Sequence, residues 1–470
     1  MLWSSILDLS LITGPLPTAI EIAGMLAGVG LLMGRSRVWW LREVPLAVVS
    51  GVVIAAAIGL AVAVFRPFPD LLPSRVLIWV AVLVVGIGLG WSRRHGGWVR
   101  VALAVVAVVA VLGTCAMKVN AFYGYRPTLA AAVGLPAADQ VDLAQLSSSP
   151  PVWAARPHQS LARSWRAPAG MPRAGRVARV TIPGGRSRFP ARPAWLYLPP
   201  AYLGVLRARL PVLVLIPGQP GGPQDWLLAG RLPAVMDAFA AAHNGLAPIV
   251  VVPDVTGSSL ANTLCLDSRL GAAETYVAED VPGWVSTHVV ADTTHLAIGG
   301  FSFGGTCSLQ LALRRPDVYR TFLDVSGQAQ PTLGDLRSTV TAAFGGDMAA
   351  FQRVDPLTEL HERSYTGTAG VLVVGRDDVA YRPQAEQVAA AAQAGGVAVT
   401  LLEVPGDHSW AIATAALASA LPWLAGRSGI LDTTPTPTGG AVPIAGMVVG
   451  SAAPMTPTAS AMSTPHARVG

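Results

Sequence analysis

The sequence has little charge for its length. Only 13% of its 470 residues are charged, whereas roughly a quarter of the residues of an ordinary soluble protein are. Hydrophobic residues make up 52% of the chain and the mean hydropathy is +0.49, so the whole chain is too apolar for that class. The net charge of +6 comes from scattered arginines without a lysine-rich or aromatic-interleaved patch, and we therefore expect no nucleic-acid partner.

Cysteine is also scarce. Three cysteines without a C-x-x-C pair exclude a disulfide-dense scaffold, and the eight histidines are dispersed, so the sequence predicts no metal site. We also expect no cofactor. No internal repeat is visible in the sequence.

What the chain has in excess is apolar residues in its first quarter. Four stretches approach the roughly 20 residues that a bilayer-spanning helix requires, at 15–34, 45–65, 75–91 and 98–117. Asp8 precedes the first stretch, and neither a charged n-region nor a small-residue cleavage site lies ahead of it. We therefore do not expect a removed signal peptide. Glu21 is the one clear ionisable residue within the spans. Residues 1–117 are therefore predicted to be a transmembrane anchor of about four helices rather than a transport pathway.

Arginines predict how these spans are oriented. The first and third connections contain the basic residues Arg35, Arg37, Arg42, Arg93, Arg94 and Arg100. The second connection holds Asp70 between Arg66 and Arg75. By the positive-inside rule the first and third connections are cytoplasmic, and everything after residue 117 lies outside. We expect a multi-pass protein of the cell (plasma) membrane with an extracytoplasmic large domain; an odd number of spans would reverse this.

The remainder divides by composition. Residues 118–175 are rich in Arg, Pro and Ala and are predicted to be a linker with one or two short helices. Residues 429–470 are Thr, Pro, Ser, Ala and Gly with hardly any charge, a composition that cannot bury a core and predicts disorder. Residues 176–428 alternate short Val/Ile/Leu runs with helical patterns, which predicts an α/β domain with a mostly parallel sheet covered by helices on both faces.

The expected strands are 177–182 and 194–198, as an opening pair, then 211–216, 248–252, 295–298, 321–325, 370–374 and 397–404. The expected helices are 232–242, 273–288, 306–314, 384–394 and 409–424.

The most informative motif, G-F-S-F-G, follows the strand expected at 295–298. Gly300 and Gly304 flank Ser302, and a helix is expected directly afterwards. A serine at the apex of a strand–turn–helix is held exposed as a nucleophile, and only residues without a Cβ let strand and helix pass that closely. The motif alone also fits a glycine-rich turn with an incidental serine, so its interpretation depends on partners.

A serine hydroxyl needs a base, and the base needs an orienting carboxylate. In this architecture they follow in the order serine, acid, histidine. Three histidines lie downstream of Ser302. His361 precedes every acid-bearing strand end, and His466 lies in the predicted tail. His408, in a loop after the last strand, is therefore the expected base; the alternative is an ordinary loop histidine near a helix start.

The acid is expected just beyond the strand at 370–374, where the sequence offers Asp377 and Asp378. We prefer Asp378 because G-x-x-D spacing turns a strand-end carboxylate back towards the histidine; either aspartate could instead cap the following helix. The oxyanion needs two backbone N–H groups. Phe303, after the nucleophile, and Gln219, in the glycine-rich loop after 211–216, are the expected donors.

Three segments together resemble the esterase branch of the α/β-hydrolases, which includes esterase D and the antigen 85 mycolyltransferases of mycobacteria. They read L-C-L-D-S-R-L-G-A-A-E-T-Y, A-I-G-G-F-S-F-G-G-T-C and R-R-P-D-V-Y-R-T-F-L-D-V-S-G. The resemblance covers residues 177–424 and implies an α/β-hydrolase fold with a triad of Ser302, Asp378 and His408. The four-span anchor resembles membrane-tethered esterases of actinobacterial cell envelopes.

Two departures bear on the activity that this resemblance implies. The oxyanion loop carries Pro217-Gly218 in place of the more usual His-Gly or Asp-Gly, and the acid is aspartate where the mycolyltransferases use glutamate. We therefore expect a serine ester hydrolase acting on an envelope-associated or lipidic ester, such as an acylated trehalose or an aminoacylated phospholipid. The alternatives are an acyltransferase working between trehalose glycolipids and a non-catalytic envelope or transport component.

A disulfide is expected between Cys265 and Cys307. An extracytoplasmic domain permits disulfides, and both cysteines follow strands whose carboxyl ends meet at one edge of the sheet. Two buried free thiols are the alternative.

Overall fold

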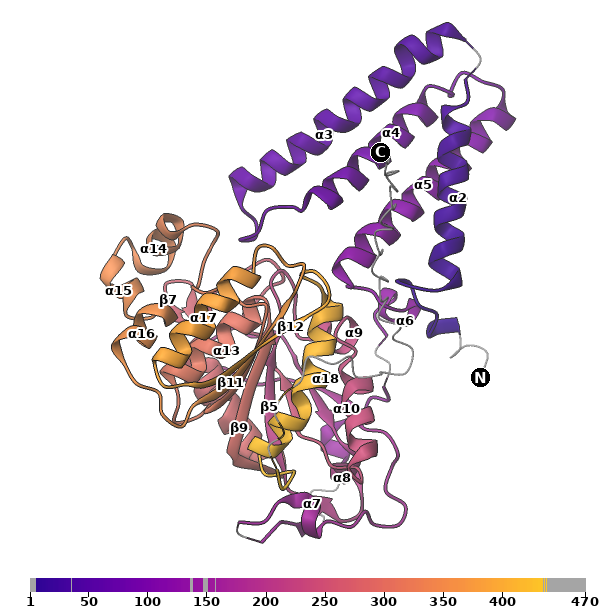
Figure 1. Cartoon of the computed structure of the whole chain (residues 1–470). Helices are drawn as coiled ribbons and strands as arrows, with labels where there is room; N and C mark the ends of the chain where they lie inside the picture. The colour runs from indigo at the N-terminus through magenta and orange to yellow at the C-terminus, as the bar shows by residue number, and fades with distance from the viewer. Residues whose placement is uncertain are drawn as a thin grey trace, which may run out of the picture.

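The computed structural model describes residues 6–34, 36–135, 138–146, 151–156, 158–433, 435 and 437. A bundle of long helices stands on an α/β domain (Figure 1). Of the tail predicted at 429–470, residues 434, 436 and 438–470 lie outside the described part of the chain.

The bundle contains the four long apolar helices that the sequence predicts. They are α2 (Pro15–Leu32), α3 (Val44–Phe65), α4 (Ser74–Trp91) and α5 (Trp98–Tyr123), with a π-helical turn η1 (Trp39–Glu43) leading into α3. With η1 counted in α3, all four are long and apolar enough to cross a membrane. Glycines let the backbones approach: a Cβ on Gly51 of α3 would lie 2.8 Å from the Ala81 carbonyl oxygen of α4.

The two ends of the bundle have different surroundings. The connections after α2 and α4 lie at the end away from the α/β domain, while the α3–α4 loop (66–73) and the end of α5 lie at the end that meets it (Figure 1). Ser10, just before α2, forms a β-bridge with Thr128 after α5. The start of α2, the α3–α4 loop and the α/β domain therefore share one side of any bilayer that the bundle spans.

An eight-stranded sheet forms the centre of the α/β domain. Its strands are β2 (Arg176–Val180), β3 (Ala194–Leu198), β5 (Leu210–Ile216), β6 (Ile249–Val252), β9 (Ala291–Phe301), β10 (Thr321–Val325), β11 (Ala369–Gly375) and β12 (Ala398–Val404). The spatial order is β12-β11-β10-β9-β5-β6-β3-β2. All pairs are parallel except that β3 runs antiparallel to both of its neighbours. This is the sheet of the α/β-hydrolase fold, as predicted.

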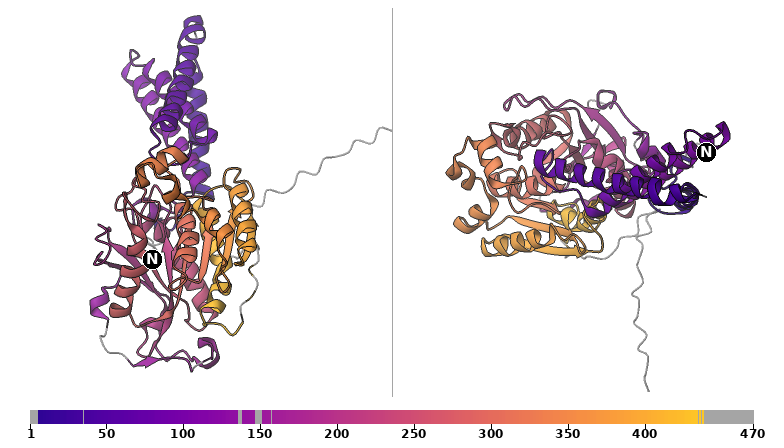
Figure 2. Two further views of the ribbon diagram at one scale, coloured as in Figure 1. Left: turned by 90° about the vertical axis from the view of Figure 1, so that its left-hand side faces the viewer. Right: turned by 90° about the horizontal axis from the view of Figure 1, so that it is seen from above.

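Helices cover both faces of this sheet (Figures 1 and 2). One face carries α10 (Leu232–Ala242) and α18 (Trp410–Arg427), and the other carries α12 (Val281–His288), α13 (Phe303–Arg314), α16 (Pro356–Glu362) and α17 (Arg382–Ala394). Because both faces are covered, β5, β6, β10 and β11 are buried along their whole length. This explains why each is a continuous apolar run.

Several elements were not predicted individually. Between β10 and β11 lie α14 (Leu336–Phe344), α15 (Met348–Gln352) and α16. The other short helices are α6 (Leu129–Ala132), η2 (Leu143–Gln145), α7 (Leu161–Ser164), α8 (Pro200–Leu203), α9 (Gln224–Leu228), α11 (Ala273–Thr275) and η3 (Tyr276–Asp280). The short strands are β1 (Val152–Trp153), β4 (Arg207–Ala208), β7 (Asp267–Ser268) and β8 (Gly271–Ala272).

Parts of the predicted linker and the first residues of the predicted tail pack against the α/β domain. Within 118–175, β1 pairs with β4, and Trp165 is only 1% exposed. Residues 429 and 430 accept backbone hydrogen bonds from α7, and Ile430 is fully buried. These segments contain single large apolar residues, which have little effect on the average composition of a segment. The α/β domain buries these residues.

Candidate active site

A sharp turn between β9 and α13 presents Ser302. β9 ends at Phe301 and α13 begins at Phe303. Ser302 has φ 57° and ψ −120°, a conformation that residues with a side chain rarely adopt. Its N–H donates to the carbonyl oxygen of Val325 at 2.8 Å, and its own carbonyl oxygen accepts from the N–H of Gly305 at 2.8 Å. The neighbouring backbone therefore holds the serine in place.

The two motif glycines are required by backbone contacts. A Cβ on Gly300 would lie 2.2 Å from the carbonyl oxygen of Gly304, and one on Gly304 would lie 2.2 Å from that of Ile216 on β5. No side-chain rotation can relieve a clash between a Cβ and the backbone. The motif is thus explained by the close approach of β9, α13 and β5.

A buried carboxylate orients His408. The Nδ1 atom of His408 lies 2.9 Å from Oδ2 of Asp378. Asp378 is 2% exposed and its other oxygen accepts the N–H of Tyr381 at 3.1 Å, whereas Asp377 is exposed. The structure therefore brings Asp378, and not Asp377, to the histidine. Since Nδ1 faces the carboxylate, Nε2 is the nitrogen left to act as a base.

Two aromatic rings hold the imidazole of His408 between them. The ring of Phe301 lies 4.9 Å from it at an interplanar angle of 29°, and the ring of Tyr381 lies 4.1 Å from it at 26°. Phe301 directly precedes Ser302, so one of the two rings that contact the imidazole belongs to the neighbour of the expected nucleophile.

The two expected oxyanion donors lie next to Ser302. Phe303 is the first residue of α13, where backbone N–H groups have no partner within the helix. Gln219 follows Gly218, and a Cβ on Gly218 would lie 3.6 Å from Cβ of Ser302. Within the described ranges, neither the Phe303 nor the Gln219 backbone N–H donates a hydrogen bond. Two free donors near a nucleophile can bind a developing negative charge.

An ion pair that the sequence did not reveal, between half-buried Arg192 and buried Asp254, holds the loop that carries Gln219. The Arg192 guanidinium lies 2.8 Å from Oδ1 of Asp254, which is fully buried, and donates to the carbonyl oxygen of Gly221 at 3.0 Å. Neither residue belongs to a motif, so only the tertiary structure identifies them.

A second buried carboxylate joins the same loop to the bundle. Asp225 accepts from the backbone N–H of Gly222 and from the hydroxyl of Tyr125, both at 2.8 Å. Tyr125 directly follows the end of α5. Burial raises the pKa of Asp225, and the hydrogen bond from Tyr125 partly offsets that rise.

A third buried carboxylate lies on β10 beneath the start of α13. Asp324 accepts from the backbone N–H of Gly327 at 2.9 Å, and burial raises its pKa to about 7. A Cβ on Gly305 would lie 2.3 Å from its Oδ1 atom, so this carboxyl group packs directly against the first turn of α13.

The structure joins Cys265 and Cys307 in a disulfide, with their Cα atoms 5.4 Å apart. Both residues are buried. Cys307 lies near the start of α13, and Cys265 lies in the long loop after β6. The bond therefore connects that loop to the nucleophile helix.

Two further polar residues near Ser302 were not anticipated. Tyr381, at the start of α17, donates its hydroxyl proton to Oδ2 of Asp70 at 2.6 Å. Asp70 belongs to the α3–α4 loop, 311 residues earlier in the chain. No local pattern could have connected them.

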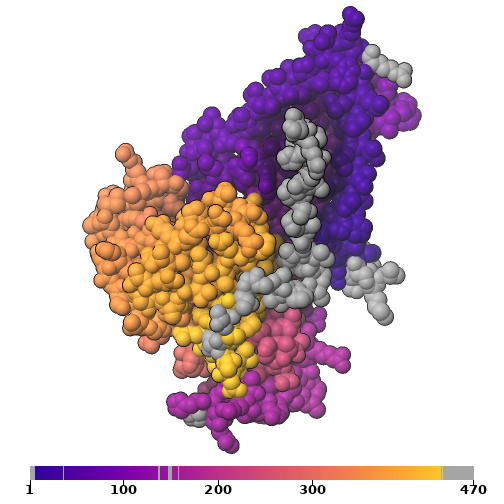
Figure 3. All heavy atoms as spheres, viewed as in Figure 1, coloured from indigo at the N-terminus to yellow at the C-terminus, as the bar shows by residue number. Residues whose placement is uncertain are grey.

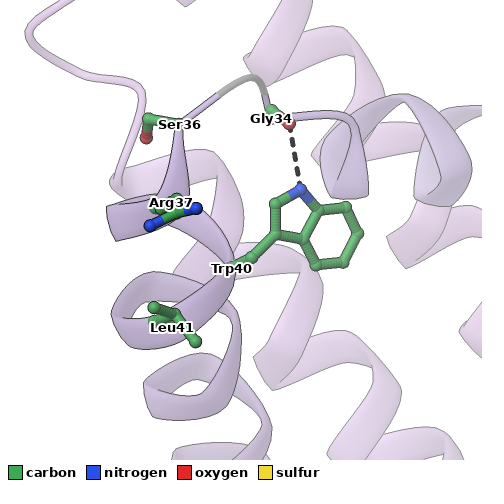
Figure 4. Close-up of a pocket in the computed structure, with 5 residues that line it drawn as sticks. All are labelled: Gly34, Ser36, Arg37, Trp40 and Leu41. Carbon is green, nitrogen blue, oxygen red and sulfur yellow. Dashed lines mark hydrogen bonds between the residues drawn. The ribbon is translucent and has the colours of Figure 1, made fainter.

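A pocket at the opposite end of the bundle is separate from these residues. Figure 4 shows it lined by Gly34, Ser36, Arg37, Trp40 and Leu41, with the Trp40 indole N–H donating to the Gly34 carbonyl oxygen at 3.0 Å. In the part of the chain that the structure describes, no group of three His, Cys, Asp or Glu side chains is arranged to hold a metal ion.

Comparisons with known proteins identify a family for this chain. A family model described as "Putative esterase" matches residues 191–424. An uncharacterized protein of Corynebacterium glutamicum is 32% identical over 436 residues, which cover 91% of this chain and 98% of that protein. The chain belongs to the esterase family of the α/β-hydrolases, and is an esterase-like hydrolase.

Solved structures resemble the α/β domain. A ferulic acid esterase is 21% identical, with a TM-score of 0.47, over 54% of this chain and 99% of its own. An S-formylglutathione hydrolase from Agrobacterium tumefaciens is 18% identical, with a TM-score of 0.46, over 55% of this chain and 97% of its own.

Proposed function

We propose that this protein is a membrane-anchored serine ester hydrolase that uses Ser302, His408 and Asp378 on an envelope-associated or lipidic ester. The observation that carries the proposal is the 2.9 Å hydrogen bond between His408 and Asp378 beside a serine at the apex of the β9–α13 turn. A purely structural His–Asp pair would not require the neighbouring serine to adopt a strained backbone conformation.

The geometry supports a two-step acyl transfer to water. Ser302 Oγ attacks the ester carbonyl carbon while His408 Nε2 takes the hydroxyl proton, and Asp378 stabilises the imidazolium. The N–H groups of Phe303 and Gln219 bind the oxyanion. The tetrahedral intermediate collapses, and the alcohol leaves with the proton from His408. Water, deprotonated by His408, then attacks the acyl-enzyme and releases the acid and Ser302.

The position of the site relative to the bundle supports a substrate held at a membrane. The carboxyl ends of the parallel strands, where Ser302 lies, face the α3–α4 loop of the bundle. If the bundle spans the cell membrane with the arginine-rich connections in the cytoplasm, the site lies extracytoplasmically, close to the bilayer. A lipid or glycolipid ester then reaches Ser302 without leaving the membrane surface.

The test uses the full-length protein in detergent or vesicles, together with Ser302→Ala. We expect a fluorophosphonate probe to label the wild-type protein, and short p-nitrophenyl esters and envelope lipids to release free acid. Ser302→Ala should lose labelling and reduce turnover at least about 10³-fold, because no other group replaces the nucleophile.

Ser286→Ala, which removes an exposed serine on α12, is the matched control and should behave as wild type. Adding trehalose as an acceptor distinguishes the reaction class, since formation of acyl-trehalose in place of free acid would show acyl transfer. Absence of both turnover and labelling in the wild-type protein would contradict the proposal.

A further inference from the structure

The α3–α4 loop of the bundle is attached to the α/β domain around the candidate active site. Arg66 donates to the carbonyl oxygen of Gly334 and lies 3.9 Å from Asp335. Arg75 lies 3.6 Å from Asp407, the residue before His408. Between these two attachments, Asp70 accepts the hydroxyl proton of Tyr381.

The loop therefore sits at the catalytic edge of the sheet. Figure 3 shows the violet end of the bundle resting against the orange surface of the α/β domain. Ser302 is 5% exposed beneath this contact.

Tyr381 connects Asp70 to His408. Its hydroxyl donates to Asp70 at 2.6 Å and accepts from Nε2 of Gln328 at 3.1 Å. A phenol has one proton, and Asp70 accepts it. The position of the Tyr381 hydroxyl is therefore fixed by Asp70 and Gln328.

Tyr381 stays protonated in this arrangement. It is 3% exposed, and burial and the nearby Asp70 carboxylate raise its pKa well above the usual range. The ring of the same residue stacks on His408 at 4.1 Å. One side chain, fixed at its hydroxyl by Asp70, thus contacts the imidazole of the base.

We propose that Asp70, supplied by the bundle, is a positioning residue of the active site that acts through Tyr381 on His408. This inference rests on the proposed hydrolase function. The bundle is then part of the catalytic site as well as an anchor. The Corynebacterium glutamicum relative matches 91% of this chain, more than the α/β domain alone contains, so the bundle and the domain occur together there too.

The role of Asp70 predicts a specific pattern among variants of the full-length protein. In Asp70→Ala the Tyr381 hydroxyl loses the acceptor that fixes it, so the ring that stacks on His408 is held less firmly and the imidazole is less well aligned for proton transfer. We expect kcat for a short p-nitrophenyl ester, and the fluorophosphonate labelling rate, to fall about tenfold, the effect of one lost hydrogen bond. KM for this small substrate should stay within about twofold.

The decisive measurement is the double variant. If Asp70 acts through the Tyr381 hydroxyl, then Asp70→Ala has no further effect in a Tyr381→Phe background, because the hydroxyl that Asp70 holds is gone. Asp70→Asn keeps the shape of the side chain and an acceptor oxygen, so its loss of kcat should be smaller than that of Asp70→Ala. Glu43→Ala removes a carboxylate from the bundle at the end away from the α/β domain, where it accepts from Ser92, and should leave kcat unchanged.

Wild-type activity in Asp70→Ala, or losses that multiply in the double variant, would overturn the role of Asp70 while leaving the hydrolase function intact. A wild-type protein that neither turns over esters nor reacts at Ser302 would instead overturn the proposed function, and the role of Asp70 with it. A loss that is equal in Asp70→Ala, Asp70→Asn and Glu43→Ala would also overturn the proposal, since it would show general damage to the bundle.

Discussion

Asp377 and Asp378 show how strongly the environment decides what a residue can do. The two side chains have the same chemistry and are adjacent in the chain, but only Asp378 is buried and bonded to His408. Asp377 is exposed, and its backbone N–H donates to the carbonyl oxygen of Gly406. Its contribution is therefore to the shape of the loop after β11 rather than to the histidine.

This difference predicts unequal effects of two otherwise matched substitutions. Asp378→Asn should lower kcat by about 10³ to 10⁴, because an amide that donates to Nδ1 stabilises the wrong tautomer of His408. Asp377→Asn should change kcat by less than about twofold. Steady-state rates with a p-nitrophenyl ester measure both effects. A larger loss of kcat in Asp377→Asn than in Asp378→Asn would show that Asp378 is not the acid.

At the scale of elements, the active site depends on how closely β9, α13 and β5 pack. The sharp turn carries Ser302 only because Gly300 and Gly304 allow three backbones to meet without side chains. The ion pair of Arg192 with Asp254 then fixes the neighbouring loop that carries Gln219. Backbone packing thus positions Ser302, and the Arg192 side chain helps to fix the loop that carries Gln219.

Gly304→Ala tests this packing. Its Cβ would lie 2.2 Å from the carbonyl oxygen of Ile216, so the turn must shift, and we expect a loss of stability of at least about 2 kcal/mol together with loss of fluorophosphonate labelling. Gly283→Ala on α12 is the matched control, since nothing lies within 4 Å of its Cβ position, and should be neutral or slightly stabilising. Thermal unfolding measures the change in stability, and fluorophosphonate labelling measures the reactivity of Ser302. A fully active Gly304→Ala would exclude close packing as the reason for the motif.

At the scale of the whole molecule, the bundle and the α/β domain are joined at several places. Tyr125 bonds to Asp225 near the loop that carries Gln219. Asp70 in the α3–α4 loop bonds to Tyr381, and Arg75 at the start of α4 lies near Asp407. The end of the bundle therefore contacts residues beside the Gln219 loop and beside His408.

The disulfide provides a test of which side of the membrane the domain occupies. Disulfides persist outside the cytoplasm and are reduced within it. If the domain is extracytoplasmic, peptide mass spectrometry without reduction, after trapping free thiols in the cells, should find Cys265 linked to Cys307. Cys115 within α5, which is free in the structure, should be recovered unlinked. Recovery of Cys265 and Cys307 as trapped thiols would contradict both the bond and the predicted orientation.

Much of this architecture follows from local sequence patterns. Apolar runs long enough to cross a bilayer predict the helices of the bundle. Short Val/Ile/Leu runs between helical segments predict the strands of the sheet, because strands covered on both faces bury every side chain. The α10 helix has the predicted bounds, Leu232–Ala242. The order serine, acid, histidine selects Ser302 and His408 because strand ends in a parallel sheet meet at one edge.

Other features depend on contacts between segments that are distant in the chain. The sequence left Asp377 and Asp378 as alternatives, because their spacing from β11 differs by only one residue and burial decides between them. Asp70, Tyr381, Arg192 and the buried part of the linker carry no local signal, since their partners are supplied by other loops. The sequence by itself determined the long helices and the strands of the main sheet, and it predicted Ser302 and His408 as candidate nucleophile and base. The packing of the bundle against the carboxyl edge of the sheet, and the residues that it adds there, were decided only by the tertiary structure.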